Sequence, residues 1–231
     1  MQQYQCKVTV LEPYDESTWH VCLTPAEPVE FRAGQYLQVV MGDKDKRPFS
    51  IANAPGLAGT LELQIGAPEG NSYASQVIEK MQQQKEVVIE AGLGTAHLQS
   101  SSESPIILVA GGTGFAYCRA IAEQLLANGH EQEILLYWGV HTPEKLYDMP
   151  AIERYQQLTG FKFIPVIDNQ ACEWDGARGT VLDKLFADEL QLDQYDIYVA
   201  GRFEMAKALR EKMAQLGIGS ERLYGDAFSF I

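Results

Sequence analysis

The stretch from residue 106 to residue 115 reads Ile106-Ile107-Leu108-Val109-Ala110-Gly111-Gly112-Thr113-Gly114-Phe115. Its first half is an uninterrupted apolar run, which is typical of a β-strand covered on both faces. Glycines follow at once, and a helical pattern begins near Ala116. A glycine-rich turn between a buried strand and a helix lets backbone N–H groups face an anionic ligand at close range. The stretch therefore predicts an anion-binding loop, although an ordinary tight turn would show the same glycines.

From this stretch to residue 231, strand and helix patterns alternate. We expect strands at 134–138, 161–167 and 197–200, a short last strand at 223–224, and helices at 116–128, 150–158, 181–190 and 203–216. Such alternation predicts a Rossmann-like, doubly wound parallel sheet over residues 105–231. Ligands of these sheets bind at the carboxyl ends of the strands, where the glycine loop stands.

Residues 1–98 follow a different pattern of short strands and turns. Apolar residues alternate with polar ones around Val8 and Val10, and again around Leu61 and Leu63. One helix is expected, at 73–82. Many short strands with a single helix predict an antiparallel β-barrel. The polar segment 99–105 is interpreted as the boundary between the two domains.

Charge and composition exclude several classes of function. The net charge of −13 opposes binding to nucleic acid or to an anionic membrane surface. No apolar run reaches the roughly 20 residues that cross a bilayer, and the first residues lack the pattern of a signal peptide. The four cysteines are widely spaced, which predicts buried free thiols and no metal site. We expect a cytoplasmic protein.

A second glycine turn is predicted at Ala200-Gly201-Arg202-Phe203-Glu204-Met205. It has the same order of strand, glycine and helix, so the two turns would share one crevice at the edge of the sheet. The alternative is an ordinary helix start, with Phe203 and Met205 in the core.

A further motif combines a cation, a proline, an aromatic ring and a hydroxyl in Arg47-Pro48-Phe49-Ser50. A turn between two strands, with Phe49 packed inward, is the simplest interpretation of these residues alone. The histidines share no spacing that would bind a metal.

Together with Arg32-Ala33-Gly34-Gln35-Tyr36, this motif resembles the flavin-binding signature of the ferredoxin–NADP reductase superfamily. The loop 111–115 resembles the nicotinamide-nucleotide loop of that superfamily. The segments 200–207 and 224–231 are similar to those of bacterial NAD(P)H:flavin oxidoreductases, a group that includes the reductase supplying reduced flavin to bacterial luciferase. The resemblance extends over essentially the whole chain.

The resemblance implies a flavin-binding barrel at 1–98 and a nicotinamide-nucleotide domain at 105–231. It implies that the Ser50 hydroxyl is catalytic and lies near the flavin N5, which accepts the hydride. The implied flavin-binding residues are Tyr36, Arg47, Pro48, Phe49, Ser50, Gly66, Ala67, Tyr73 and Thr113. The implied nucleotide-binding residues are Gly111, Gly112, Thr113, Gly114, Phe115, Gly139, Gly201, Arg202, Phe203 and Met205. Many superfamily members have Cys-Gly-Pro where this chain has Ala200-Gly201-Arg202, so no thiol is expected beside the nicotinamide.

The expected activity is hydride transfer from NADH or NADPH to a diffusible flavin. Riboflavin, FMN or FAD would be the substrate, and a flavin-dependent monooxygenase is an expected recipient of the reduced flavin. Two alternatives stay open: a reductase component with bound flavin that serves a protein partner, and a non-catalytic nucleotide sensor. No cysteine set could hold an iron–sulfur cluster, which disfavours the first alternative. Residues 139–144 contain no arginine, so NADH should serve at least as well as NADPH.

Overall fold

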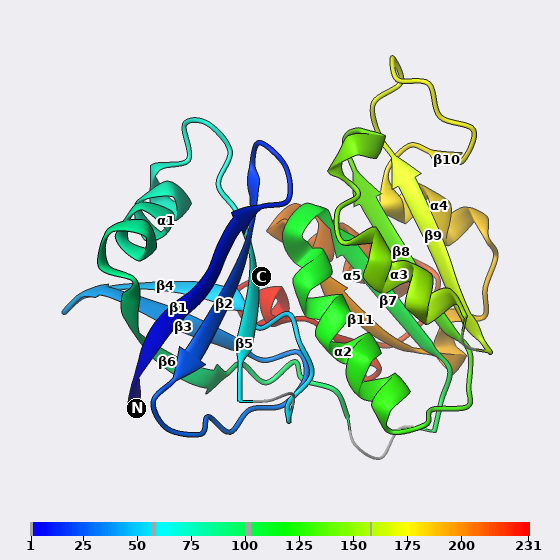
Figure 1. Cartoon of the computed structure of the whole chain (residues 1–231). Helices are drawn as coiled ribbons and strands as arrows, with labels where there is room; N and C mark the ends of the chain where they lie inside the picture. Colours follow the sequence, from blue (N-terminus) through cyan, green and yellow to red (C-terminus); the bar gives the residue numbers. More distant parts are fainter. Residues whose placement is uncertain (1, 57–58, 100–102, 158) are drawn as a thin grey trace. The chain divides into compact units, whose positions relative to one another are not determined.

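The computed structural model describes residues 2–56, 59–99, 103–157 and 159–231. The chain forms two compact units, one of residues 1–98 with 119–124, the other of residues 99–118 with 125–231. Figure 1 shows the elements of both units. The segment 99–105 was interpreted as a domain boundary, and its residues 100–102 lie outside the described ones.

The first unit is built on a six-stranded antiparallel sheet in the order β4-β3-β6-β1-β2-β5. This confirms the predicted antiparallel β class. The sheet is barrel-like and not closed, because the strand order ends at β4 on one side and β5 on the other. The elements are β1 Gln3–Pro13, β2 Thr18–Pro25, β3 Tyr36–Gly42, β4 Asp45–Ser50, β5 Leu61–Gly66, α1 Ser72–Gln84 and β6 Glu86–Leu93.

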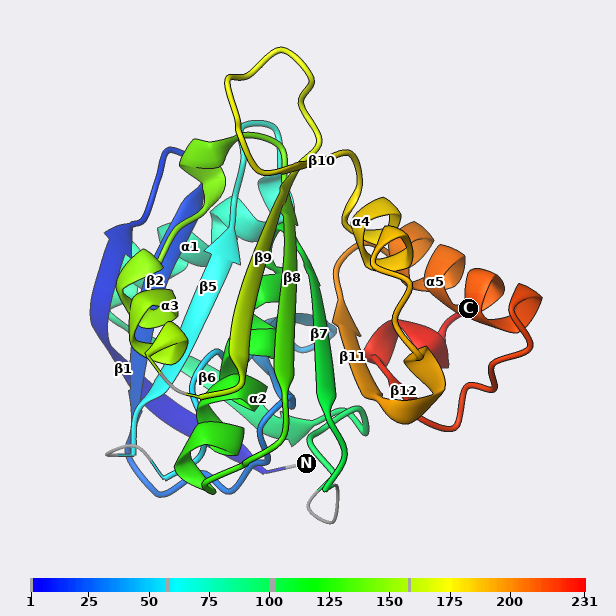
Figure 2. The same ribbon diagram turned by 90° about the vertical axis from the view of Figure 1, so that its right-hand side faces the viewer.

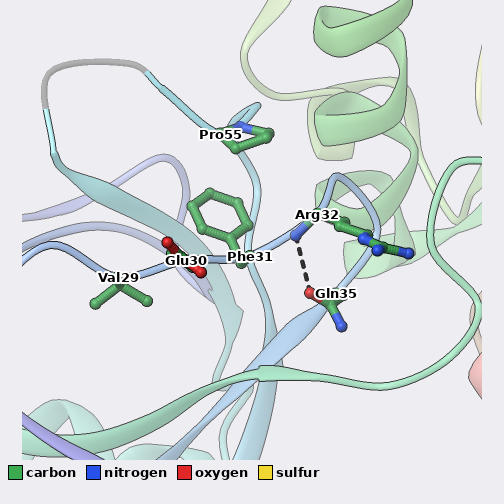
Figure 3. A pocket seen from close by; sticks show the side chains of 6 residues that line it. All are labelled: Val29, Glu30, Phe31, Arg32, Gln35 and Pro55. Atoms are coloured by element: carbon green, nitrogen blue, oxygen red, sulfur yellow. Dashed lines mark hydrogen bonds between the residues drawn. The ribbon is translucent and has the colours of Figure 1, made fainter. Parts of the chain in front are cut away.

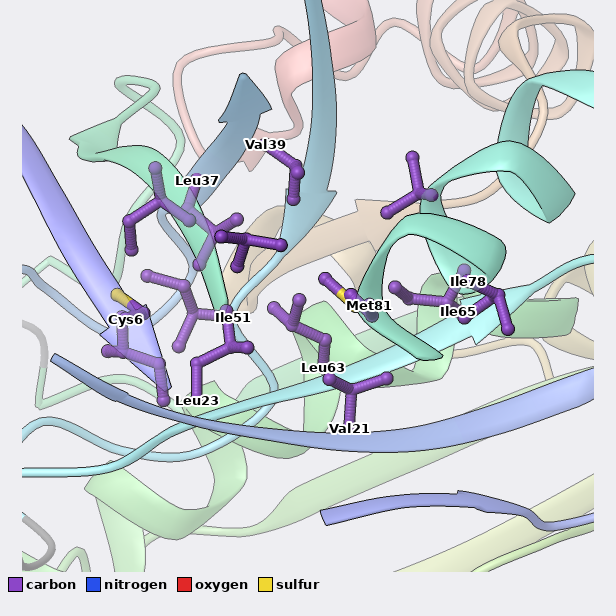
Figure 4. Packing of buried hydrophobic residues seen from close by; sticks show 14 of the residues in the cluster. Cys6, Val21, Leu23, Leu37, Val39, Ile51, Leu63, Ile65, Ile78 and Met81 are labelled. Carbon is purple, nitrogen blue, oxygen red and sulfur yellow. The ribbon is translucent and has the colours of Figure 1, made fainter. Parts of the chain in front are cut away.

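The core of this unit lies between the curved sheet and α1. Alternate residues of the strands, such as Val21, Leu23 and Val39, are fully buried, as a period of two requires. The predicted helical face, which consists of Ala74, Val77, Ile78 and Met81, joins the same cluster (Figure 4). Burying this face holds α1 against the sheet.

The interpretation of Arg47–Ser50 as a turn is wrong. These residues lie in β4, whose ladder with β3 runs from Ser50 opposite Tyr36 to Asp45 opposite Gly42. β4 is an edge strand, so Pro48 has no second neighbouring strand that needs its missing N–H.

The second unit is a six-stranded parallel sheet in the order β10-β9-β8-β7-β11-β12, with helices on both faces. It confirms the predicted doubly wound sheet. Figure 2 shows α4 and α5 on one face and α2 and α3 on the other. Its elements are β7 Ile106–Gly111, α2 Phe115–Ala127, β8 Ile134–Val140, α3 Met149–Gln156, β9 Phe161–Ile167, β10 Ala177–Arg178, α4 Val181–Ala187, β11 Asp196–Ala200, α5 Phe203–Gln215 and β12 Leu223–Tyr224.

The strand order places the switch point of the sheet between β7 and β11. The chain passes from β7 through β8 and β9 to one edge, then returns to β11 on the other side of β7. Ligands of open α/β sheets bind outside the carboxyl ends of the strands at such a point.

Three of the four cysteines, Cys6, Cys22 and Cys118, are buried, and all four are free thiols, as predicted; Cys172 is half-buried. Within the ranges that the structure describes, no helix has the length and apolar character needed to span a membrane.

Candidate functional site

The first unit presents Tyr36 and Ser50 side by side on its outer face. The two are direct cross-strand partners on β3 and β4, so their side chains emerge on the same side of the sheet. Both side chains are half-buried, and Pro48, two residues before Ser50, is exposed on the same face. The Ser50 hydroxyl makes no hydrogen bond to any of the residues described, so it is available to a ligand.

Arg47 points to the opposite side of β4, toward α1. It pairs across the ladder with the core residue Val39, and its side chain is only 8% exposed. Its guanidinium forms an ion pair with Asp45, with Nη2 lying 2.6 Å from Oδ2, and lies 4.6 Å from the centroid of the Tyr73 ring. The resemblance implies that Arg47 and Ser50 bind the same flavin. Side chains alternate between the two faces along β4, so these two side chains lie on opposite faces.

Charge at Arg47 is locally balanced. The hydrogen bond from Arg47 lowers the pKa of the Asp45 carboxyl, and the same bond raises the pKa of the guanidinium. Tyr73, on the first turn of α1, is 47% exposed. The cation and the aromatic ring thus form one pair at the start of this helix.

Asn71 caps the N-terminus of α1. The side chain of Asn71 accepts a hydrogen bond from the N–H of Ala74, which uses one of the free donors of the helix start. Gly66 ends β5 opposite Thr18, and Ala67 packs against the core cluster. The structure thus places these two predicted flavin residues at the end of β5, on the approach to α1.

A cavity of about 480 Å³ in the first unit adjoins the segment that precedes Tyr36. Figure 3 shows it, with lining residues Val29, Glu30, Phe31, Arg32, Gln35 and Pro55. Gln35 fixes this loop, because its Nε2 donates to the carbonyls of Gly92 and Gly94 and its Oε1 accepts from the N–H of Arg32. None of the predicted flavin residues lines this cavity.

The glycine loop of the second unit follows β7 as predicted. Gly112 has a φ of 53°, a backbone conformation that glycine adopts without strain. Gly114 lies against β11 so closely that a Cβ on it would come 2.2 Å from the carbonyl oxygen of Ala200. The side chain of Phe115 is fully buried and stacks on Trp138, with 3.9 Å between the two ring centroids. This contact anchors the end of the loop in the core of the second unit.

Gly111 and Gly201 meet at the switch point of the sheet. They directly follow Ala110 and Ala200, which are paired residues of β7 and β11. A Cβ on Gly111 would lie 3.6 Å from the Cα of Gly201 and 2.9 Å from the Sδ of Met205. The two glycines therefore allow β7, β11 and the Met205 side chain to pack closely at the carboxyl ends of these strands, where open α/β sheets bind their ligands.

The remaining predicted nucleotide residues surround this point on exposed or half-buried positions. Arg202 is exposed and Phe203 is 52% exposed, so the interpretation of Phe203 as a core residue is wrong. Met205 and Thr113 are half-buried. Gly139, near the carboxyl end of β8, is the ladder partner of Gly111 on β7.

The residues that follow β8 and β9 include a histidine–aspartate pair that sequence reasoning did not find. His141 Nδ1 lies 2.6 Å from Asp168 Oδ1, and both side chains are exposed. A cavity of about 630 Å³ in the following loop is lined by Cys172, Glu173, Trp174, Asp175, Gly176 and Arg178. The guanidinium of Arg178 donates to the carbonyls of Cys172 and Trp174, so this cation is engaged by its own loop.

Comparisons with known proteins agree with both units. Residues 108–211 match the model of the oxidoreductase NAD-binding domain. The chain is 45% identical to an NAD(P)H-flavin reductase of Vibrio harveyi, over 98% of this chain and 99% of that protein. It is 43% identical to an NAD(P)H-flavin reductase of Aliivibrio fischeri, over 98% of both chains.

Among solved structures, a cytochrome P450 reductase of Amycolatopsis superposes with a TM-score of 0.88 at 25% identity, over 97% of this chain and 69% of that one. This neighbour shows that the fold of the chain is also found in a cytochrome P450 reductase. The identity to the two flavin reductases, sustained along nearly the full length of each, goes further: this chain belongs to the family of NAD(P)H-flavin reductases.

Proposed function

We propose that the outer face at Tyr36 and Ser50 holds the flavin ring and that the edge at Gly111 and Gly201 holds the nicotinamide nucleotide. The chain, a member of the flavin reductase family, transfers a hydride from NADH or NADPH to a diffusible flavin. The observation that carries this proposal is the meeting of two glycine turns at the switch point of a parallel sheet. Relatives that match over nearly their whole length are flavin reductases, which disfavours the alternative of a component with fixed flavin.

The hydride chemistry belongs to the two cofactor rings, which exchange two electrons and one proton in a single transfer. The chain contributes position and local polarity. Ser50 offers a hydroxyl with no partner among the described residues, which can donate a hydrogen bond to the ring atom that receives the hydride. Tyr36 offers an aromatic surface beside it on the same face. No residue needs to take up negative charge for this step.

The test is steady oxidation of NADH by the pure protein, with and without added riboflavin. Oxidation should depend on riboflavin and proceed through many turnovers at substoichiometric protein. Gly111→Ala places a methyl group at the switch point, against the flexible end of Met205, and should raise the KM for NADH about tenfold or more. Gly42→Ala, where nothing lies within 4 Å of the new Cβ, is the matched control.

The proposal divides the chain by role into a flavin-binding part, residues 1–98, and a nucleotide-binding part, residues 105–231. It also places the enzyme in the cytoplasm, where it would supply reduced flavin to a flavin-dependent monooxygenase. A reductase that releases reduced flavin needs such an acceptor, because free reduced flavin reacts with oxygen. A coupled assay that detects product of the monooxygenase only when this chain, NADH and flavin are all present tests that role.

A further inference from the structure

The guanidinium of Arg47 is almost fully occupied by groups of its own unit. Nε donates to Asp45 Oδ1 at 2.9 Å, and Nη2 donates to Asp45 Oδ2 at 2.6 Å and to Gln76 Oε1 at 2.8 Å. Nη1 donates to the carbonyl oxygen of Tyr73. These bonds use four of the five N–H groups that an arginine carries.

The position of Arg47 matters because it is the cation at the start of α1. Helix starts and arginines are the usual binding groups for phosphate. Between Arg47 and Lys80 the sequence contains no other lysine or arginine. The Nζ of Lys80 donates to the carbonyl of Val40 at 2.9 Å. A phosphate that approached this helix start would therefore depend on Arg47.

Asp45 already binds the Arg47 guanidinium and would compete with a phosphate for it. Its carboxylate forms a two-pronged ion pair with Arg47, which is the geometry in which phosphate would also bind an arginine. A phosphate would have to displace the carboxylate, or share the guanidinium with a second negative charge a few ångströms away. Glu69, just before the helix, adds another negative charge on the approach.

We propose that Asp45 is a specificity-determining residue, which withholds Arg47 from the phosphate of FMN or FAD and leaves riboflavin an equally good substrate. This inference rests on the proposed function of the first unit. Arg47 then acts as a positioning residue that ties β4 to the first turns of α1 through Tyr73 and Gln76. Discrimination between flavins depends on this single carboxylate.

The test compares riboflavin with FMN in wild type and in Asp45→Asn, which keeps the shape of the side chain and removes its charge. Dissociation constants of the oxidised flavins are measured by fluorescence quenching, and kcat/KM by NADH oxidation. In the wild type the two flavins should bind alike. In Asp45→Asn the preference for FMN over riboflavin should rise about tenfold or more, as expected for one gained charge-assisted hydrogen bond.

Three further variants isolate the cause. Asp43→Asn removes the same charge from an exposed position in the same hairpin and should leave the ratio at its wild-type value. Asp45→Glu keeps a carboxylate and should also keep that ratio. Adding Arg47→Gln to Asp45→Asn should abolish the gain for FMN, because the released guanidinium is then absent.

Several outcomes overturn the inference. One is a folded Asp45→Asn protein with an unchanged ratio, and another is an equal shift in Asp43→Asn. Should Asp45→Asn not fold, the wild type still decides: a preference for FMN that salt abolishes would mean that a cation already binds the phosphate. A shifted binding ratio without NADH turnover would refute the proposed function alone. Failure of the wild type to bind either flavin would refute both.

Discussion

At the scale of single residues, the role proposed for the Ser50 hydroxyl can be tested directly by substitution. Ser50→Ala should lower kcat by about 10- to 100-fold, by analogy with the loss of one positioned hydrogen-bond donor. The melting temperature should change little, because this hydroxyl bonds to none of the residues described. Steady-state kinetics with riboflavin and a thermal melt give both quantities, and Ser75→Ala on α1 is the control. Wild-type turnover in the variant would remove Ser50 from the site.

Gly114 shows how closely the glycine loop after β7 lies against the sheet. Gly114→Ala would bring a methyl carbon 2.2 Å from the backbone oxygen of Ala200, which has no flexible side chain to move. We expect a loss of about 3 kcal/mol or more in the free energy of unfolding, at the upper end of overpacking. Urea denaturation measures it, with Gly42→Ala as an unhindered control. A loss below about 1 kcal/mol would show that this loop yields easily.

Sequence reasoning could not predict on which side of the sheet each proposed site residue lies. The motif at 47–50 suggested that Arg47 and Ser50 share one ligand, and only the strand assignment of β4 separates them. Asp45 was missed, although a carboxylate two positions before an arginine on a strand shares its face and could have been recognised. The contribution of Gln76 could not have been found, because it depends on where α1 packs.

At the scale of elements, strong periodicity was a good guide and weak patterns were not. The strand 161–167 and the helix face of α1 agree with the sequence pattern because buried residues repeat at the required spacing. The helix expected to reach Leu190 ends at Ala187, where Glu189 turns to a φ of 51°. β4 carries a proline, so its sequence pattern predicts a turn, whereas its ladder with β3 makes it an edge strand.

The link between β2 and β5 should make stability depend on pH. His20 Nε2 lies 3.4 Å from Cys22 Sγ and 3.8 Å from Glu62 Oε2, and its Nδ1 lies 3.4 Å from Glu12 Oε1. The hydrogen bond with Cys22, followed by that with Glu62, raises the pKa of His20 to about 10. A raised pKa stabilises the fold fully below the ordinary value near 6.5, and this contribution is lost as the pH rises toward 10.

His20→Gln should therefore cost the most stability at pH 6 and progressively less at higher pH. A loss of about 1.5–3 kcal/mol is expected at pH 6, typical of a hydrogen bond to a charged group. Urea denaturation of both proteins at pH 6 and pH 9 measures the difference. An equal loss at both values would mean that the imidazole is neutral throughout.

At the scale of the whole molecule, we expect negative charge to disfavour NADPH as the nucleotide. The chain carries a net charge of −13, and the exposed Asp168 lies beside His141 at the ends of β8 and β9. A 2′-phosphate placed there would meet a carboxylate, so kcat/KM for NADH should be at least equal to that for NADPH. Asp168→Asn should shift the ratio toward NADPH severalfold, whereas the exposed Asp193→Asn should not. A strong NADPH preference in the wild type would contradict this assignment.

The binding groups available in the first unit also bear on whether flavin is retained or released after each turnover. Tight retention of FMN or FAD requires donors or positive charge at the phosphate. Here Arg47 is held by Asp45, the N–H of Ala74 is held by Asn71, and Pro68 has no N–H to donate. We therefore expect only the ring and the nearby ribityl chain to be recognised, and the flavin to leave after each turnover.

This predicts a nearly colourless purified protein and similar KM values for riboflavin, FMN and FAD. Absorbance at the flavin band after gel filtration gives the bound fraction, and steady-state kinetics with excess NADH give the three constants. The experiment separates a reductase of free flavin from a component that keeps its flavin and passes electrons to a protein. A yellow protein with one flavin per chain would support the second mechanism, since electrons would then have to leave through a bound group.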